Sequence, residues 1–437
     1  MNHIFKAGAA QTDISPVNSQ FLFGYPFVKR YSTGVNDPLF SSALYLSNGR
    51  AEQLYIANDV IFVSKNSVRV TRRRIAEKTG VAPENILISA THTHSAPITV
   101  TYASNVDDDT VPGVDSEYLC RLEDGIVAAG VNAFQSATDA EAAFVTADAT
   151  GIGTNRRDPS GPALHNVPVV AVRRRDDSAL LGIMLVCNMH PTVLHEDSLL
   201  ASADFPGFAR RHLQTVFGEC PVIHHTGPSG NQSPRHVTKS NTFAEAERIG
   251  GILGAAVERA LSGASYSAGV LLASCGSSIT PVPRSFPSVD DAQRRLEQAQ
   301  ARYEELKQTG TPQAARGAEV DLFGAHETLT LAKLEASGEL ETYRASCAPA
   351  EVQVMRTGPF WFAGWSGEVF VEYGIKLGAA QKNAYLISMA NGEMQGYLVT
   401  DEAAEEGGYE ASNALFAPET ARRMLTETLR LIQESRT

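Results

Sequence analysis

The sequence of 437 residues lacks three features that each define a class of protein. No apolar run reaches the roughly 18 residues of a membrane-spanning helix, so stable insertion into a bilayer is not expected. There is no excess of positive charge, because 37 Lys and Arg stand against 49 Asp and Glu, and the net charge of −12 disfavours nucleic acid as a partner. The five cysteines include no CxxC pair, so neither a zinc knuckle nor a disulfide framework is indicated.

The first residues also lack the basic stretch and the long apolar core of a secretory signal. Unpaired cysteines far apart in the sequence are typical of reduced, mostly buried thiols. Together these observations predict a cytoplasmic protein. A hydrophobic content of 43% and a charged content of 20% are ordinary for a globular chain with a sizeable core.

Strand-like and helix-like segments alternate along the chain and predict an α/β fold, a mixed β-sheet core flanked by helices. The strand-like runs are 44–46, 53–56, 60–63, 86–89, 169–172, 180–187 and 222–225. The helix-like runs are 67–80, 116–134, 205–216, 244–261 and 418–434.

Residues 288–337 differ from the rest and predict an inserted helical hairpin. Residues 288–308 are highly charged, and Leu296, Ala299, Tyr303 and Leu306 form a seam at heptad-like spacing. A turn at 310–312 precedes a second expected helix over 318–337. The hairpin either packs on its own domain or serves as a lid or a dimerisation surface. A homo-oligomer is compatible with this sequence, and we expect one domain over 1–437.

The strongest local motif is His92-Thr93-His94-Ser95, which follows the apolar run 86–89. On an extended strand end, residues two apart point to the same side, so both imidazoles can face one cavity and bind a metal. The alternative is a pair of surface or hydrogen-bonded histidines, since HxH also occurs by chance.

Further polar residues follow other apolar runs. His190 comes after 180–187, with His195 as a competing candidate, and a glycine-rich turn around Ser233 follows His224-His225. Glu368 comes after a later run, and a carboxylate with histidines is a normal set of zinc ligands.

These motifs, in this order, resemble the catalytic domain of the neutral, non-lysosomal ceramidases. The resemblance runs from the segment Gly8 to Ile14 as far as Tyr409-Glu410. In that family an HTHSGP segment, an HPTS-like segment, a PGE segment and a Tyr before a VT-type dipeptide supply the zinc ligands. The resemblance implies that Zn²⁺ is held by the matching residues of this chain, which are His92, His190, Glu368 and Tyr397.

The same resemblance implies three catalytic residues beside the metal. His94 matches the family's active-site histidine, Arg156 the arginine of an NR segment, and Tyr409 a second active-site tyrosine. Ser233 matches a serine proposed as a nucleophile in that family. Because no adjacent His–Asp pair would activate it, we interpret Ser233 as a positioning or structural residue.

The chain also departs from the family pattern. Ser233-Pro234 is followed by Arg235 where the family has Asn, and the segment 288–337 has no counterpart. Only a short segment follows Tyr409, so we expect the family's immunoglobulin-like C-terminal domain to be absent.

The resulting hypothesis is a zinc-dependent amidohydrolase that cleaves an N-acyl amide of small size with metal-activated water. Bound zinc lowers the pKa of water from 15.7 to about 7. His94, Arg156 and Tyr409 would stabilise the oxyanion and protonate the leaving amine. The alternatives are a zinc hydrolase acting on an ester or lactone, an amidohydrolase-type barrel, and a non-catalytic metal-binding protein.

Overall fold

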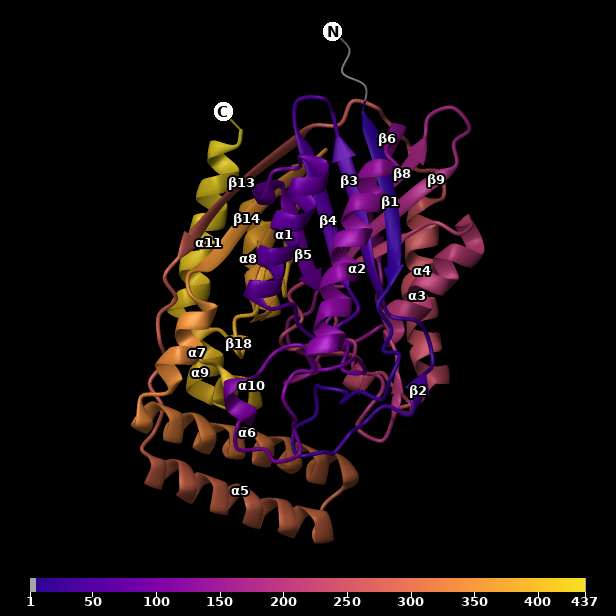
Figure 1. Cartoon of the computed structure of the whole chain (residues 1–437). Coiled ribbons are helices and arrows are strands. Elements are labelled where there is room, and N and C mark those ends of the chain that lie inside the picture. The colour runs from indigo at the N-terminus through magenta and orange to yellow at the C-terminus, as the bar shows by residue number, and fades with distance from the viewer. Residues whose placement is uncertain (1–4, 437) are drawn as a thin grey trace.

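The computed structural model describes residues 5–436, and its largest element in that range is a mixed sheet of eight strands (Figure 1). The strand order is β11-β9-β8-β6-β1-β3-β4-β5. The pairs β4–β5 and β9–β11 are parallel and the other pairs are antiparallel. The strands are β1 (Lys6–Asp13), β3 (Phe40–Ser47), β4 (Glu52–Asn58), β5 (Ile86–Ala90), β6 (Thr138–Asp148), β8 (Asn166–Arg174), β9 (Leu180–Cys187) and β11 (Val222–Thr226).

A smaller sheet packs face to face on the large one. Its strands, in spatial order, are β13 (Leu272–Ile279), β14 (Ala350–Thr357), β15 (Phe360–Trp365) and β17 (Ala384–Ile387). Alternation along the strands separates the two faces of the large sheet. Val170 and Met184 point into the core between the sheets, whereas their neighbours Val169 and Leu185 point to the opposite face.

Helices cover the two outer faces and complete a four-layer arrangement of the described residues (Figure 1). The large sheet is covered by α1 (Lys65–Thr79), α2 (Ser116–Gln135), α3 (Phe205–Phe217) and α4 (Phe243–Leu261). The small sheet is covered by α8 (Val371–Ala380) and α11 (Glu419–Glu434). The amphipathic face of each helix is buried against a sheet, which is the usual source of helix stability in a protein. The predicted α/β class is therefore confirmed.

The charged segment forms a hairpin of two helices, α5 (Val289–Thr309) and α6 (Pro312–Ser337), which lies across one end of the sheets (Figure 1). It packs on its own chain, because α6 contacts α10 (Tyr409–Asn413) and α7 (Leu340–Cys347). Packing on the same chain is therefore observed, and the roles as a lid or a dimerisation surface stay predictions.

Two expectations about local structure are wrong. The second helix of the hairpin begins at Pro312 and not at 318, because Thr311 caps it by accepting a hydrogen bond from the N–H of Ala314. The apolar run 60–63 is a buried loop and not a strand. Its carbonyls at Val60 and Ile61 are used by His92, so they pair with no neighbouring strand.

Among residues 5–436, none of the helices combines the length and the apolar character that crossing a bilayer requires.

The buried pair His224 and His225 on β11 generates the first testable prediction. Burial lowers the pKa of each ring to about 3, whereas an unfolded histidine has a pKa near 6.5. Between these values the unfolded chain binds more protons, so the free energy of unfolding falls as the pH falls from about 6.5 to 3. We expect His224→Leu to flatten this dependence by up to about 1.4 kcal/mol per pH unit, the value for one proton. Urea titrations between pH 4.5 and 7 measure the slope, and an unchanged slope would contradict the assignment.

Candidate metal centre and active site

His92 lies just beyond β5, and its backbone has the left-handed φ of +67°. Its N–H donates to the Val60 carbonyl at 3.0 Å, and Nδ1 lies 2.9 Å from the Ile61 carbonyl oxygen. Such a conformation costs about 1–3 kcal/mol in a residue other than glycine and is typical of functional sites. Both imidazoles face one cavity, as predicted, but not from an extended strand end, because His92 lies beyond β5 and has a left-handed backbone.

His190 follows β9, and its ring is also fixed by a backbone carbonyl. Its Nδ1 lies 2.6 Å from the Ser229 carbonyl oxygen, and its ring is fully buried. Because a carbonyl oxygen can only accept, Nδ1 must carry the proton in both His92 and His190. In the neutral rings each Nε2 is therefore an acceptor, the tautomer in which histidine binds metals.

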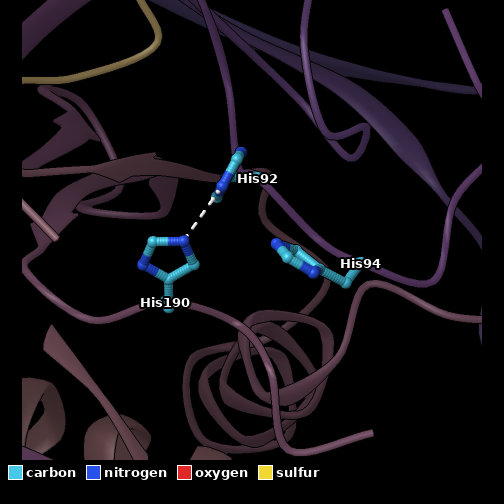
Figure 2. Close-up of side chains that lie close together, drawn as sticks. All are labelled: His92, His94 and His190. Atoms are coloured by element: carbon cyan, nitrogen blue, oxygen red, sulfur yellow. Dashed lines mark hydrogen bonds between the residues drawn. The ribbon is translucent and has the colours of Figure 1, made fainter. Parts of the chain in front are cut away.

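Three acceptor atoms converge at this point. The Nε2 atoms of His92 and His190 are 3.0 Å apart, and Oε2 of Glu368 lies 3.3 and 3.2 Å from them (Figure 2 shows the two rings). Oε2 is buried and receives no hydrogen bond within the described part of the chain. Lone pairs packed this closely repel one another unless a cation lies among them.

The charges of the cluster agree with a cation site. Burial, followed by the charge of Arg156, lowers the pKa of His190 to about 4, so this ring is neutral at pH 7. Burial opposes ionisation of Glu368, but the adjacent His92 and His190 outweigh it and hold the pKa of this carboxyl well below its usual range. The result is a buried carboxylate beside a neutral imidazole.

The residues fit zinc. Tetrahedral zinc with bonds of about 2.0–2.2 Å separates neighbouring ligand atoms by roughly 3.3 Å, close to the distances between the three acceptors. Tyr397 lies beside them, because the short parallel strands β16 (Glu368–Val369) and β18 (Tyr397–Leu398) pair Glu368 directly with Tyr397. Gly396 is required before Tyr397, since a Cβ there would lie 2.0 Å from the Asn413 carbonyl oxygen.

His94 defines a second candidate set of ligands. The ring nitrogens of His92, His94 and His190 include one atom each within 4.8 Å of the others, and Figure 2 shows the three rings around one space. Both nitrogens of His94 are buried without a hydrogen-bond partner among residues 5–436. We favour Glu368 over His94 as the third ligand, because its oxygen lies nearer to both Nε2 atoms and bears a charge. This choice leaves the nitrogens of His94 for substrate.

His94 is held in place by residues that the sequence did not single out. The buried Arg30 donates to the His94 carbonyl and, at 3.0 Å, to Ser95 Oγ. Gly24, with a φ of +125°, packs against the ring, and a Cβ there would lie 2.5 Å from it. Tyr25 contacts the ring edge to face at 5.3 Å. These contacts fix the ring beside the acceptor cluster.

Arg156 and Tyr409 meet the cluster from another side. Nε of Arg156 donates to Glu410 at 2.8 Å, and the guanidinium lies 5.4 Å from the centre of the Tyr397 ring. Nη2 of Arg156 is buried and has no partner within residues 5–436. The rings of Tyr397 and Tyr409 are 6.0 Å apart. Arg156 and Tyr409 can therefore donate hydrogen bonds to an oxygen that gains negative charge near the cluster.

Ser233 is 3% exposed and lines a cavity together with His94 and Arg156. It has no histidine partner in the described range. Its Oγ accepts a hydrogen bond from the N–H of Arg235 at 3.3 Å and caps a short 3₁₀ helix. This contact supports the structural interpretation over a nucleophile. His195 lies farther out on the cavity wall, where Nδ1 contacts the Asn241 amide at 2.9 Å.

The hairpin contributes a buried carboxyl group that the sequence analysis missed. Glu327 on α6 accepts hydrogen bonds from Asn413 at 2.5 Å and from Asn105 at 3.5 Å. With His92, Glu368 and others it lines a small cavity at the acceptor cluster. Burial is the main cause that raises the pKa of this carboxyl to about 8. A single glutamate in a charged helix carries no sequence signal that would have revealed it.

A cavity of about 720 Å³ leads to this site, a volume in the range of small-molecule pockets. Its inner wall includes His94, Arg156, Ser233, Tyr397 and Tyr409. Its outer wall is formed largely by the hairpin.

The fold and the buried histidine–carboxylate cluster thus define an α/β protein with a candidate metal centre. The family model described as "Neutral/alkaline non-lysosomal ceramidase, N-terminal" matches residues 5–220. Residues 5–220 are thus similar to the family that the motifs indicated. The matched range includes His92, His94, Arg156 and His190, whereas Glu368 and Tyr397 lie beyond it.

Solved structures extend the likeness in fold to nearly the whole chain. Neutral ceramidase from Pseudomonas aeruginosa is 17% identical, with a TM-score of 0.75 over 98% of this chain and 74% of that one. A ceramidase complexed with C2 is 16% identical, with a TM-score of 0.76 over 99% of this chain and 75% of that one. The curated proteins include no match.

The second prediction distinguishes the two ligand sets. His92→Ala, His190→Ala and Glu368→Ala should each lose bound metal and activity, because each removes one of the converging acceptors. His94→Ala and Tyr409→Phe should retain the metal and lose turnover by about 10²–10⁴, the range of general acid–base help. Elemental analysis and hydrolysis assays on the same samples measure both quantities.

Tyr397→Phe serves as an intermediate case, since a phenol becomes a ligand only after losing its proton. Burial, followed by the charge of Glu368, raises the pKa of this phenol well above its usual value. We expect weaker metal binding and not its loss. Loss of metal from His94→Ala together with its retention by Glu368→Ala would instead establish the three-histidine set.

Proposed function

We propose that this chain is a zinc-dependent hydrolase of N-acyl amides. The observation that carries the proposal is the convergence of His92, His190 and Glu368, two of which, His92 and Glu368, line the small cavity at the cluster. The family match over residues 5–220 and the ceramidase fold support the same reaction.

His92, His190, Glu368 and Tyr397 would hold the zinc ion. When bound, zinc supplies a water of lowered pKa and a Lewis acid for a carbonyl oxygen.

The other side chains act on the substrate. Arg156 and Tyr409 donate to the carbonyl oxygen as it gains charge, and preorganised donors of this kind often make the largest catalytic contribution. His94 is placed to transfer a proton to the leaving nitrogen. Burial, followed by the charges of His92 and His190, lowers the pKa of His94 well below its usual value. It is therefore neutral at pH 7, and it must take up a proton during the reaction before it can give one to the amine.

The third prediction concerns metal removal. Protein as isolated should contain about one zinc per chain, since one set of ligands defines one site. A chelator should abolish hydrolysis of a short N-acyl amide, and added zinc should restore it. Full activity without metal would contradict the mechanism. Hydrolysis of matched esters but not of amides would instead favour an esterase or lactonase with the same centre.

The fourth prediction concerns chain length. We expect short, soluble N-acyl amides to be cleaved with a higher kcat/KM than long-chain ceramide. The charged hairpin residues Arg302, Arg316 and Asp321 interrupt a cavity lining that also contains Leu306, Val320 and Phe323, so a long alkyl chain would cover charged groups as well as apolar ones. Parallel assays of ceramide in detergent and of a short-chain panel test this. A clear preference for ceramide would contradict it. The cytoplasmic location stays a prediction.

A further inference from the structure

Arg235 is a cation on the cavity wall that has no counter-ion. It lies in a 3₁₀ helix (Pro234–His236), directly after Ser233. Within residues 5–436 its guanidinium makes neither a hydrogen bond nor an ion pair.

The other arginines of the cavity wall are already paired with carboxylates. Arg156 and Arg157 share Glu410, at 2.8 and 3.1 Å. Arg316 contacts Glu196 at 2.8 Å. Arg157 also contacts Glu406, Arg302 lies 3.9 Å from Asp321, and Arg316 also contacts Glu319.

The remaining carboxylate of the wall is Asp158. Its Oδ1 accepts hydrogen bonds from the N–H and the hydroxyl of Ser160, at 2.9 and 2.7 Å. Among the described residues that line the cavity, five arginines thus face four carboxylates, and Arg235 is the one left over.

Arg235 is an exposed residue of the cavity wall, with charges of both signs nearby. Partial desolvation, followed by the positive charges of Arg156 and Arg316, lowers the pKa of its guanidinium, whereas Glu410 and Asp321 raise it. Arg156 is close in the backbone as well, because its N–H donates to the Asn231 carbonyl at 2.8 Å and Ser233 pairs with Thr154. Arg235 therefore faces the same space as the donor that we assign to the scissile carbonyl. An anion bound there would relieve the repulsion.

We propose that Arg235 binds a carboxylate of the substrate, so that the preferred substrate is an N-acyl amide that carries a carboxylate, such as an N-acyl amino acid. A guanidinium binds a carboxylate through two parallel hydrogen bonds, which gives direction as well as affinity. The inference rests on the proposed hydrolase activity and specifies its substrate class. Arg156 then holds the reacting carbonyl, while Arg235 holds the carboxylate farther along the cavity.

The test compares matched substrates that differ in charge. One is a short N-acyl amino acid and the other is the same compound with its carboxylate converted to a carboxamide. A third carries the carboxylate on the acyl part, which identifies the side of the scissile bond that Arg235 faces. The wild-type protein should favour a carboxylate substrate, and R235Q should lower the ratio of kcat/KM between charged and neutral substrates by about 10- to 100-fold, the range for hydrogen bonds to a charged group. R235K should restore part of the ratio.

The matched control is R302Q, which removes an arginine of the same cavity wall and should leave the ratio unchanged. A ratio that R235Q does not alter, or that R302Q lowers equally, would overturn the inference. Calorimetry with a ketomethylene analogue of the N-acyl amino acid separates this result from the reaction itself. Loss of affinity in R235Q would support the carboxylate site even if no amide were cleaved, and equal affinity of both proteins would overturn it.

Discussion

The site depends on the crowding of three buried acceptors, the Nε2 atoms of His92 and His190 and the Oε2 atom of Glu368. Such atoms repel one another without a cation, so the surrounding chain must hold them in place by other means. Backbone carbonyls at Ile61 and Ser229 fix the two rings through Nδ1. The strand pair β16–β18 fixes the carboxylate. The left-handed backbone at His92 is part of the same constraint, because it turns the ring toward the other two acceptors.

Charged residues around the acceptor cluster connect it to the inserted hairpin. Glu410 neutralises Arg156 and Arg157, and α10, which carries Glu410 and Tyr409, packs on α6. Glu327 adds a hydrogen bond from α6 to Asn413 at the end of α10. The hairpin thus supports α10, which carries Tyr409 and Glu410, in addition to forming part of the cavity wall.

The sequence predicted the class of fold because strand and helix periodicities record which faces are buried, as in β8 and β9. It also indicated the family, because the motifs around His92 and His190 are local. The run 60–63 was misassigned because its apolar side chains are as buried as those of a strand, while its carbonyls serve His92. The roles of Arg30 and Glu327 could not be predicted, since each acts through partners that are distant in the chain, such as Asn413, 86 positions from Glu327. The ligand roles of Glu368 and Tyr397 came from resemblance, and they stay predictions.

The long separation between partners has a consequence for biosynthesis. Arg156 and Glu410 are 254 positions apart. At translation rates of about 5–20 residues per second, Glu410 is therefore synthesised roughly 13–50 seconds after Arg156. His92 and His190 are 98 positions apart, and they emerge well before Glu368. During that interval the ribosome carries a chain with two of the three converging acceptors. The acceptor cluster and the cavity are therefore completed only after the large sheet has been synthesised.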